Sequence, residues 1–180
     1  LAGGATLVAN EVSPTRAGLV RNALAVFDDP PQVLEEDGRE LGALLAGTVD
    51  RVLLDAPCTG LGALRRRPEA RWRKQLSDLP GLTALQLELV TAAAAALRPG
   101  GLLAYVTCSP HVAETTVAVN HAVHKCGLSL LDTPAVLSRI AVDEPDIRGS
   151  GSAQLWPHVH GTDAMFIALL EKPLSQGGPR

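Results

Sequence analysis

Two short strings, each holding one cysteine, constrain this chain more than any other feature of the sequence. DAPCTGLG (residues 55–62) begins at the end of the apolar run RVLLD, and YVTCSP (residues 105–110) completes the apolar run GLLAYV. We predict that each run is a buried strand. Because the carboxyl ends of parallel strands open onto one edge of a sheet, where ligands bind, Asp55, Cys58 and Cys108 are expected to meet in one cleft.

The remaining pattern favours an α/β fold with an open parallel sheet and helices on both faces, because apolar runs and helical segments alternate. We predict strands at residues 6–12, 32–37, 51–55, 102–106, 128–131 and 164–171, and helices at residues 14–27, 40–46, 82–97 and 111–125. Residues 132–163 are expected to form one long loop, since they contain several Pro and Gly turn signals. We assign residues 1–172 to one domain and expect a disordered tail over 173–180.

Composition limits the class of protein. The chain has 180 residues, a net charge of −3 and three cysteines. The odd number of cysteines argues against a disulfide framework and indicates a reducing cytoplasm. No apolar run approaches the ~18 residues of a membrane span, and no charged-then-apolar start resembles a signal peptide. The chain begins with Leu1 rather than Met, so we expect a fragment or a processed product.

The spacing of cysteines and histidines argues against a metal site. The sequence has no CxxC and no HxxxH pattern, and these are the spacings expected for zinc ligands. His158 and His160, in the string WPHVHGTD, could chelate a metal in principle, but a structural role is the better interpretation. Cys126, next to Gly127 at the end of a predicted helix, is expected to behave as a small buried hydrophobe.

Several strings, in this order, resemble the Sun/Fmu family of RNA cytosine-5 methyltransferases: DAPCTG, RRRPEARWR, TCS and LWPHVHGTD. The resemblance extends to about Lys172. It implies a Rossmann-like methyltransferase fold with an antiparallel last strand, and S-adenosylmethionine as cofactor. It also implies that Cys108 is the nucleophile that adds to carbon 6 of cytosine, while Cys58 assists release. Such covalent catalysis turns one hard step into two easier ones. DNA cytosine methyltransferases use the Pro-Cys cysteine as nucleophile, so the reverse assignment stays open.

Three acids at successive predicted strand ends are candidate cofactor ligands. Glu11 is placed to accept the ribose hydroxyls, although the family more often has Asp there. By resemblance, Asp37 reaches the adenine amino group, and Asp55 lies near the methionine amine and the target base. We assign Pro57 to the same site, where its fixed φ stiffens the turn that presents Cys58. The alternative for any one acid is a solvated surface carboxylate.

The resemblance also implies parts that this chain lacks. The family's first strand and Gly-rich loop, which hold the methionine end of the cofactor, would lie upstream of Leu1, and Gly3-Gly4 is no substitute. Residues 6–12 and 51–55 would then lack a shared neighbour, and exposed strand edges favour self-association. We therefore expect the isolated chain to bind cofactor weakly and to be inactive.

A basic segment follows the first cysteine string. Residues 65–74 carry a net charge of +5, so the rest of the chain carries −8. Cationic side chains there would supply salt-dependent affinity for phosphates, and an aromatic ring could stack on a base. The alternative is a solvated basic face. We predict an RNA-binding strip, with ribosomal RNA as the expected partner, made of Arg65, Arg66, Arg67, Arg71, Trp72, Arg73 and Lys74.

Two other function classes stay open. One alternative is a non-catalytic RNA-binding fragment, which keeps the basic strip but holds no cofactor. The other is a DNA cytosine methyltransferase, although the TCS cysteine and the place of the basic segment argue against it. A cofactor titration separates the first class from an enzyme, and a comparison of RNA with DNA of the same sequence separates the second.

Overall fold

The structure is a computed structural model that describes residues 4–142, 146–147 and 150–174. The strands are β1 (Val8–Asn10), β2 (Gln32–Leu34), β3 (Val49–Asp55), β4 (Leu97–Thr107), β5 (Ser129–Leu130), β6 (Ala153–Gln154) and β7 (Phe166–Glu171). The α-helices are α1 (Pro14–Leu24), α2 (Leu41–Leu44), α3 (Ala70–Arg73), α4 (Leu79–Ala96), α5 (Thr116–His124), α6 (Thr133–Ile140) and α7 (Pro157–His160). Short 3-10 helices are η2 (Leu61–Ala63), η3 (Leu76–Asp78) and η4 (Val112–Glu114).

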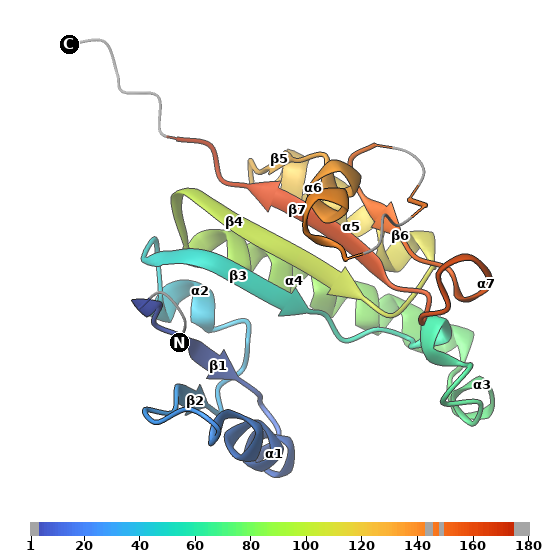
Figure 1. The fold of residues 1–180 in the computed structure, drawn as a ribbon, viewed down its shortest axis with the longest axis horizontal. Helices are drawn as coiled ribbons and strands as arrows, with labels where there is room; N and C mark the ends of the chain where they lie inside the picture. Colours follow the sequence, from blue (N-terminus) through green and yellow to red (C-terminus); the bar gives the residue numbers. More distant parts are fainter. Residues whose placement is uncertain (1–3, 143–145, 148–149, 175–180) are drawn as a thin grey trace.

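The strands form two separate sheets (Figure 1). β1 and β2 pair in parallel. In the larger sheet the order is β3, β4, β7, β5, and β6 also pairs with β7. β3 and β4 are parallel, whereas β7 runs antiparallel to β4, which confirms the expected antiparallel last strand. Within the described residues, β1 and β3 lie in different sheets and share no neighbouring strand, as the sequence led us to expect.

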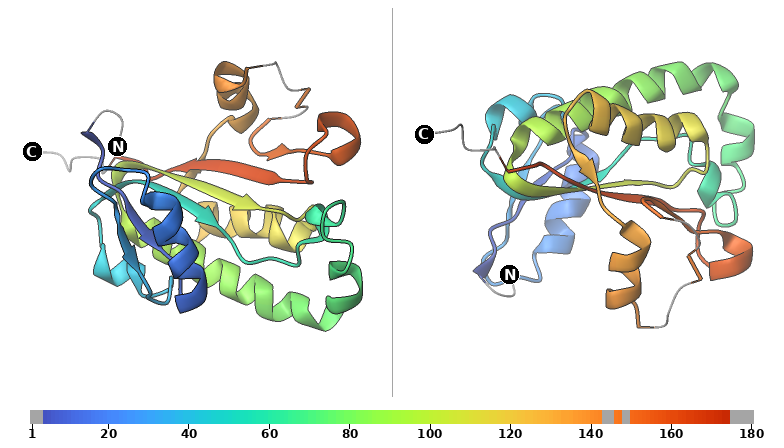
Figure 2. Two further views of the ribbon diagram at one scale, coloured as in Figure 1. Left: turned by 60° about the horizontal axis from the view of Figure 1, so that its bottom comes forward. Right: turned by 90° about the horizontal axis from the view of Figure 1, so that it is seen from above.

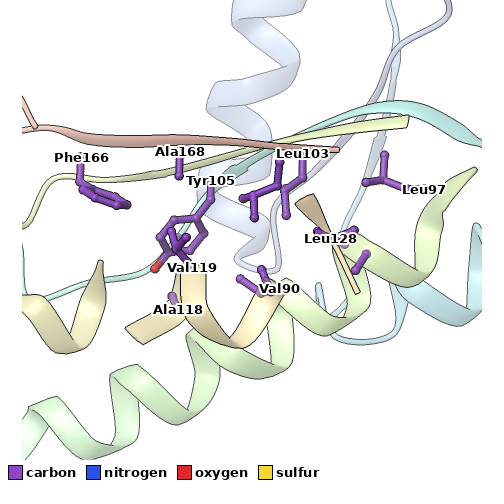
Figure 3. Close-up of a cluster of buried hydrophobic side chains, with 14 residues drawn as sticks. Val90, Leu97, Leu103, Tyr105, Ala118, Val119, Leu128, Phe166 and Ala168 are labelled. Atoms are coloured by element: carbon purple, nitrogen blue, oxygen red, sulfur yellow. The ribbon is translucent and has the colours of Figure 1, made fainter. Parts of the chain in front are cut away.

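The core lies between one face of the larger sheet and two helices. Alternate side chains of β4 and β7 point to this face, among them Tyr105 and Phe166, whose rings meet edge to face with centroids 6.3 Å apart. Val90 of α4 and Val119 of α5 pack against them (Figure 3). α6 lies on the opposite face of the sheet (Figure 2). Helices therefore cover both faces, as predicted.

The long helix α4 joins this core to the rest of the fold. The segment Leu76–Ala96 is long and apolar enough to cross a membrane by length and composition alone. Its residues Val90, Ala93 and Ala94 belong to the core cluster, and Gln86, also buried, donates to the Pro57 carbonyl. Lys172 Nζ donates to the carbonyls of Ala94 and Leu97 at the end of the helix, where a cation is favoured. We therefore interpret α4 as a core helix.

The predicted long loop over residues 132–163 is wrong, because this stretch contains α6, β6 and α7. α6 begins after Asp132, whose carboxylate accepts a hydrogen bond from the Ala135 N–H. Pro134 fits the first helical turn, where its missing N–H costs nothing. The Thr-Pro pair is thus a helix start rather than a turn.

Other element boundaries also differ from those predicted. The helix expected over residues 111–125 is divided at Thr115, whose φ and ψ are −123° and −87°, into η4 and α5. The strand expected over residues 102–106 begins at Leu97, directly after α4 ends. Most of the predicted tail, residues 175–180, lies outside the described residues.

Candidate active site

The structure brings Cys58 and Cys108 together at the carboxyl ends of β3 and β4. The parallel register pairs Asp55 with Val106, and the Ala56 N–H still donates to the Val106 carbonyl at 2.9 Å. The two loops therefore leave the sheet side by side. The sulfur atoms of the two cysteines lie 3.4 Å apart and share a hydrogen bond.

This sulfur contact makes the two thiols chemically different. A hydrogen bond from Cys58 lowers the pKa of Cys108 to about 7, against burial and the negative charge of Asp55, which act to raise it. The same contact, followed by burial, raises the pKa of Cys58. Because the thiolate is the nucleophilic form of cysteine, this difference favours Cys108 over Cys58 as the nucleophile of the pair.

Gly62 connects three loops around the thiols. Its N–H donates to the Cys108 carbonyl and its own carbonyl accepts from the Ala164 N–H, both at 2.9 Å. A Cβ atom at this position would lie 2.1 Å from the Ala164 oxygen and 2.8 Å from the Cys108 oxygen. Only a glycine fits at position 62. Packing therefore explains this residue, whereas a glycine in the sequence alone is weak evidence for a functional site.

A buried carboxylate links both cysteine loops. The Glu114 side chain is fully buried, and it accepts hydrogen bonds from Thr59 and Ser109, the residues that follow Cys58 and Cys108. Gln86 donates to it at 3.3 Å and to the Pro57 carbonyl at 2.8 Å. Glu114 is not among the site residues predicted from the sequence. Its only signal is an acid six residues after the TCS cysteine, at the start of a mostly apolar helix.

The candidate cofactor acids Glu11 and Asp37 follow β1 and β2, and Asp55 ends β3; Glu11 and Asp37 already have partners. Glu11 accepts hydrogen bonds from Arg16 and from the Ser13 N–H, both at 2.8 Å, and these bonds lower its pKa. Arg39 binds Asp37 through two nitrogens, at 3.0 and 2.6 Å, and lowers the pKa of Asp37 to about 2. Both carboxylates are therefore anionic acceptors at neutral pH.

The ends of β1 and β2, which carry these two acids, are fixed to each other. The Asn10 side chain donates to the Glu36 carbonyl at 3.0 Å and accepts from the Glu36 N–H at 3.1 Å. The Glu11 N–H donates to the Leu34 carbonyl at 3.1 Å. Asn10 is likewise not among the residues predicted from the sequence, where a polar side chain at a strand end is its only signal.

The basic segment divides into two parts. Arg65 donates to the Gly161 carbonyl, and Arg66 forms an ion pair with Asp163 at 2.5 Å, so these two side chains hold the loop after α7. The exposed part projects beyond them on and around α3, where Arg71 lies over the Trp72 ring at 5.6 Å. Trp72 is 82% exposed. All seven residues of the strip are exposed, including Arg65 and Arg66, and we use the name exposed part only for those that do not hold the loop after α7: Arg67, Arg71, Trp72, Arg73 and Lys74.

The two histidines of the WPHVHGTD string have local contacts. His160 Nδ1 accepts a hydrogen bond from the Trp156 N–H at 2.9 Å, and the His158 ring lies 6.2 Å from the Trp156 ring. In the part of the chain that the structure describes, no three His, Cys, Asp or Glu side chains are grouped as metal ligands.

Substituting Gly62 with Ala should disrupt the site. The added methyl group would collide with backbone atoms, and we expect a loss of about 3 kcal/mol or more in the free energy of unfolding. Gly18→Ala in α1 is the matched control, because a Cβ there meets nothing within 4 Å. That variant should gain up to about 1 kcal/mol. Urea denaturation of both variants tests this, and equal stabilities would contradict it.

The reactivity of Cys108 should depend on Cys58. In the unsubstituted protein, alkylation of Cys108 by iodoacetamide should rise as pH passes through about 7, because the thiolate reacts. In Cys58→Ala, which removes the donor, the rise should move to higher pH. Peptide mass spectrometry separates Cys108 from Cys126. A profile that is the same with and without Cys58 would show that the sulfur contact does not set the pKa.

The chain matches a known family over nearly its whole length. The family model described as 16S rRNA methyltransferase RsmB/F matches residues 1–171. A putative methyltransferase of Mycobacterium tuberculosis is 51% identical over 171 residues, which cover 93% of this chain and 35% of that protein. Ribosomal RNA small subunit methyltransferase B of Pasteurella multocida is 31% identical, over 95% of this chain and 38% of that protein.

Solved structures show the same fold. NSun6 from Pyrococcus horikoshii, solved with SFG, superposes with a TM-score of 0.77 at 28% identity, over 93% of this chain and 41% of that one. The protein PH0851 gives a TM-score of 0.82 at 29% identity, over 93% and 37%. The chain thus spans little more than a third of the curated relatives described above. With its fold, its paired thiols and this match, the chain belongs to the RsmB/F family of 16S rRNA methyltransferases.

Proposed function

We propose that the protein containing this chain transfers a methyl group from S-adenosylmethionine to carbon 5 of a cytosine in ribosomal RNA, through a covalent adduct with Cys108. The observation that carries the proposal is the 3.4 Å contact between the Cys58 and Cys108 sulfurs, together with the lowered pKa of Cys108. Methyl transfer to an oxygen or nitrogen atom of RNA needs no such pair of thiols. Carbon 5 of cytosine, in contrast, needs a nucleophile that activates it.

The thiols have distinct tasks in this proposal. The Cys108 thiolate forms a bond to carbon 6 of cytosine, which makes carbon 5 an enamine carbon able to attack an electrophilic methyl group. S-adenosylmethionine supplies that methyl group when it is bound. Water accepts the proton of carbon 5, the electron pair of that C–H bond re-forms the double bond between carbons 5 and 6, and the bond between carbon 6 and the Cys108 sulfur breaks to release the thiolate. Cys58 keeps its proton and donates to the departing sulfur, which stabilises the thiolate as a leaving group.

The residues that would hold the cofactor are Glu11, Asp37, Asp55 and Pro57. These residues suit the cofactor. Arg16 and Arg39 hold Glu11 and Asp37 in their anionic forms, and carboxylates at strand ends accept hydrogen bonds from ribose hydroxyls in α/β folds. Asp55 lies close enough to Cys108 for its charge to affect the thiol, which connects the cofactor end of the site to the reacting sulfur. Pro57 stiffens the turn that leads from Asp55 to Cys58.

The substrate in this proposal is RNA in the cytoplasm, held by the exposed part of the basic strip. Figure 1 shows α3 at the end of the molecule to which the carboxyl ends of β3 and β4 point, and in this proposal the cations of α3 bind phosphates next to the target base. Trp72 offers a ring face for an unpaired base.

The cysteine roles predict opposite behaviour of two variants in the full-length protein. Cys108→Ala should lose methyl transfer, because no adduct can form. Cys58→Ala should accumulate a covalent complex with RNA when S-adenosylmethionine is present, because release is slowed. Denaturing gel electrophoresis shows the slow band.

The same gel distinguishes the alternatives. Cys126→Ala is the control and should neither trap RNA nor lose activity. Trapping by Cys108→Ala but not Cys58→Ala would reverse the two roles. Trapping on DNA rather than RNA of the same sequence would contradict the substrate, and full activity of Cys108→Ala would contradict the covalent mechanism.

The exposed part of the strip should contribute to RNA affinity through its charge. Replacing Arg67, Arg71 and Arg73 together with Ala should weaken binding and reduce the slope of log affinity against log salt by about 0.7 per lost phosphate contact on single-stranded RNA. Arg139→Ala, an exposed arginine on α6, is the control and should leave the slope unchanged. Filter binding over a range of salt measures this. An unchanged slope in the triple variant would mean that the strip is a solvated face.

A further inference from the structure

Each cysteine of the candidate site is followed by a hydroxyl residue, and both hydroxyls bind the same carboxylate oxygen. Thr59 Oγ1 and Ser109 Oγ each donate to Glu114 Oε2 at 2.6 Å. The Thr59 N–H donates to Glu114 Oε1 at 2.7 Å. Two loops that come from different strands are therefore joined through one side chain, directly beside the two thiols.

We propose that Glu114 is the positioning residue of the site: it holds the Cys58 loop and the Cys108 loop at the spacing that lets their sulfurs meet. The inference rests on the proposed function, because the sulfur contact matters only if these thiols act together. Glu114 touches no reacting atom in this proposal. It acts through Thr59 and Ser109.

The burial of Glu114 supports a dedicated role. Its side chain and that of Ser109 are fully buried, and Thr59 is 6% exposed. A buried carboxylate is costly unless hydrogen bonds satisfy it. Among the ion pairs of the described residues, none involves Glu114, so neutral donors alone stabilise it. With Gln86 at 3.3 Å, four donors occupy the four acceptor sites that a carboxylate offers.

Glu114 is itself fixed from several directions. Its backbone carbonyl accepts from the Tyr105 hydroxyl at 2.7 Å, and its N–H donates to the His111 carbonyl at 2.9 Å. Gln86, on α4, bridges Glu114 and the Pro57 carbonyl. The Glu114 backbone is thus held by β4 and its carboxylate by α4, both part of the core, so that Glu114 has a fixed position from which to bind both loops.

Loss of the Glu114 side chain should move the two thiols apart. The hydrogen bond from Cys58 is the largest influence that lowers the pKa of Cys108, so a change in the sulfur distance must alter the pH at which Cys108 reacts. A displacement of about 1 Å at a reacting group can cost about 10²-fold in rate. A residue that only stabilised the fold would lower stability without changing the thiol pH profile.

The test compares variants in the full-length protein. In Glu114→Ala, Cys108 alkylation should shift to higher pH, and kcat should fall by about 10²-fold with KM for RNA little changed. Glu114→Gln should rescue most of both properties, because its amide oxygen can accept from the Thr59 N–H while its NH₂ donates to the two hydroxyls. Its kcat should stay within about 10-fold of the unsubstituted protein.

Thr133→Val is the matched control for lost stability. Thr133 is fully buried and its hydroxyl accepts from the Leu169 N–H at 3.0 Å, so the variant also leaves a buried donor without a partner. It lies outside the cysteine loops and should leave the Cys108 pH profile unchanged. Ser109→Ala removes one of the Glu114 bonds and should shift the profile upward even if Glu114→Ala fails to fold.

The outcomes separate the positioning role from the proposed function. A folded Glu114→Ala, or failing that a folded Ser109→Ala, with an unshifted Cys108 profile would overturn the positioning role. An equal shift in Thr133→Val would do the same, since the effect would then reflect general destabilisation. If the unsubstituted protein does not methylate RNA and Cys58→Ala does not trap it, the proposed function is wrong, and the alkylation profiles still decide whether Glu114 sets the thiol spacing.

Discussion

The parallel pairing of β3 with β4 is the interaction on which the site depends. Its register, which ends with Asp55 opposite Val106, determines that both cysteine loops begin at the same level of the sheet. A slip of one residue would turn every side chain of a strand to the other face, and Tyr105 would then leave the core. Burial of Leu103 and Tyr105 therefore fixes where Cys58 and Cys108 lie, so the packing of the core sets the geometry of the thiols.

The site contains polar groups where hydrophobic packing alone would place none. Glu114, Gln86 and Ser109 are fully buried among apolar side chains. Gln86 Oε1 has no hydrogen-bond partner among the described residues, and such a group costs about 1–3 kcal/mol. Gln86 is nevertheless held by Pro57 and Glu114 through its nitrogen. This distribution fits a network selected for the position of two loops rather than for stability.

The sequence predicted those features that follow from local patterns and from one topological rule. Apolar runs identified β3 and β4, and the rule about strand ends brought Cys58 and Cys108 together. The sequence did not predict α6, because a string Asp-Thr-Pro is compatible with a turn as well as with a helix start. The hydrogen bond from the Ala135 N–H to Asp132 identifies it as a helix start. The sequence also did not predict Glu114, since no local pattern shows a hydrogen bond between residues 55 positions apart. The contacts of Arg65 and Arg66 with the loop after α7 escaped for the same reason.

Those arginine contacts connect the basic strip to the thiols. Asp163 raises the pKa of Cys108 through its charge, and Arg66 forms an ion pair with the same carboxylate. Arg66 follows closely on Gly62, whose N–H binds the Cys108 carbonyl. One continuous segment from Thr59 to Arg66 therefore carries a Glu114 bond at its start, a bond to the Cys108 loop in its middle and an ion pair at its end. In the proposed function, this same segment would position both a phosphate bound beyond Arg66 and a base held at Cys108, and it would couple RNA binding to the geometry of the thiols.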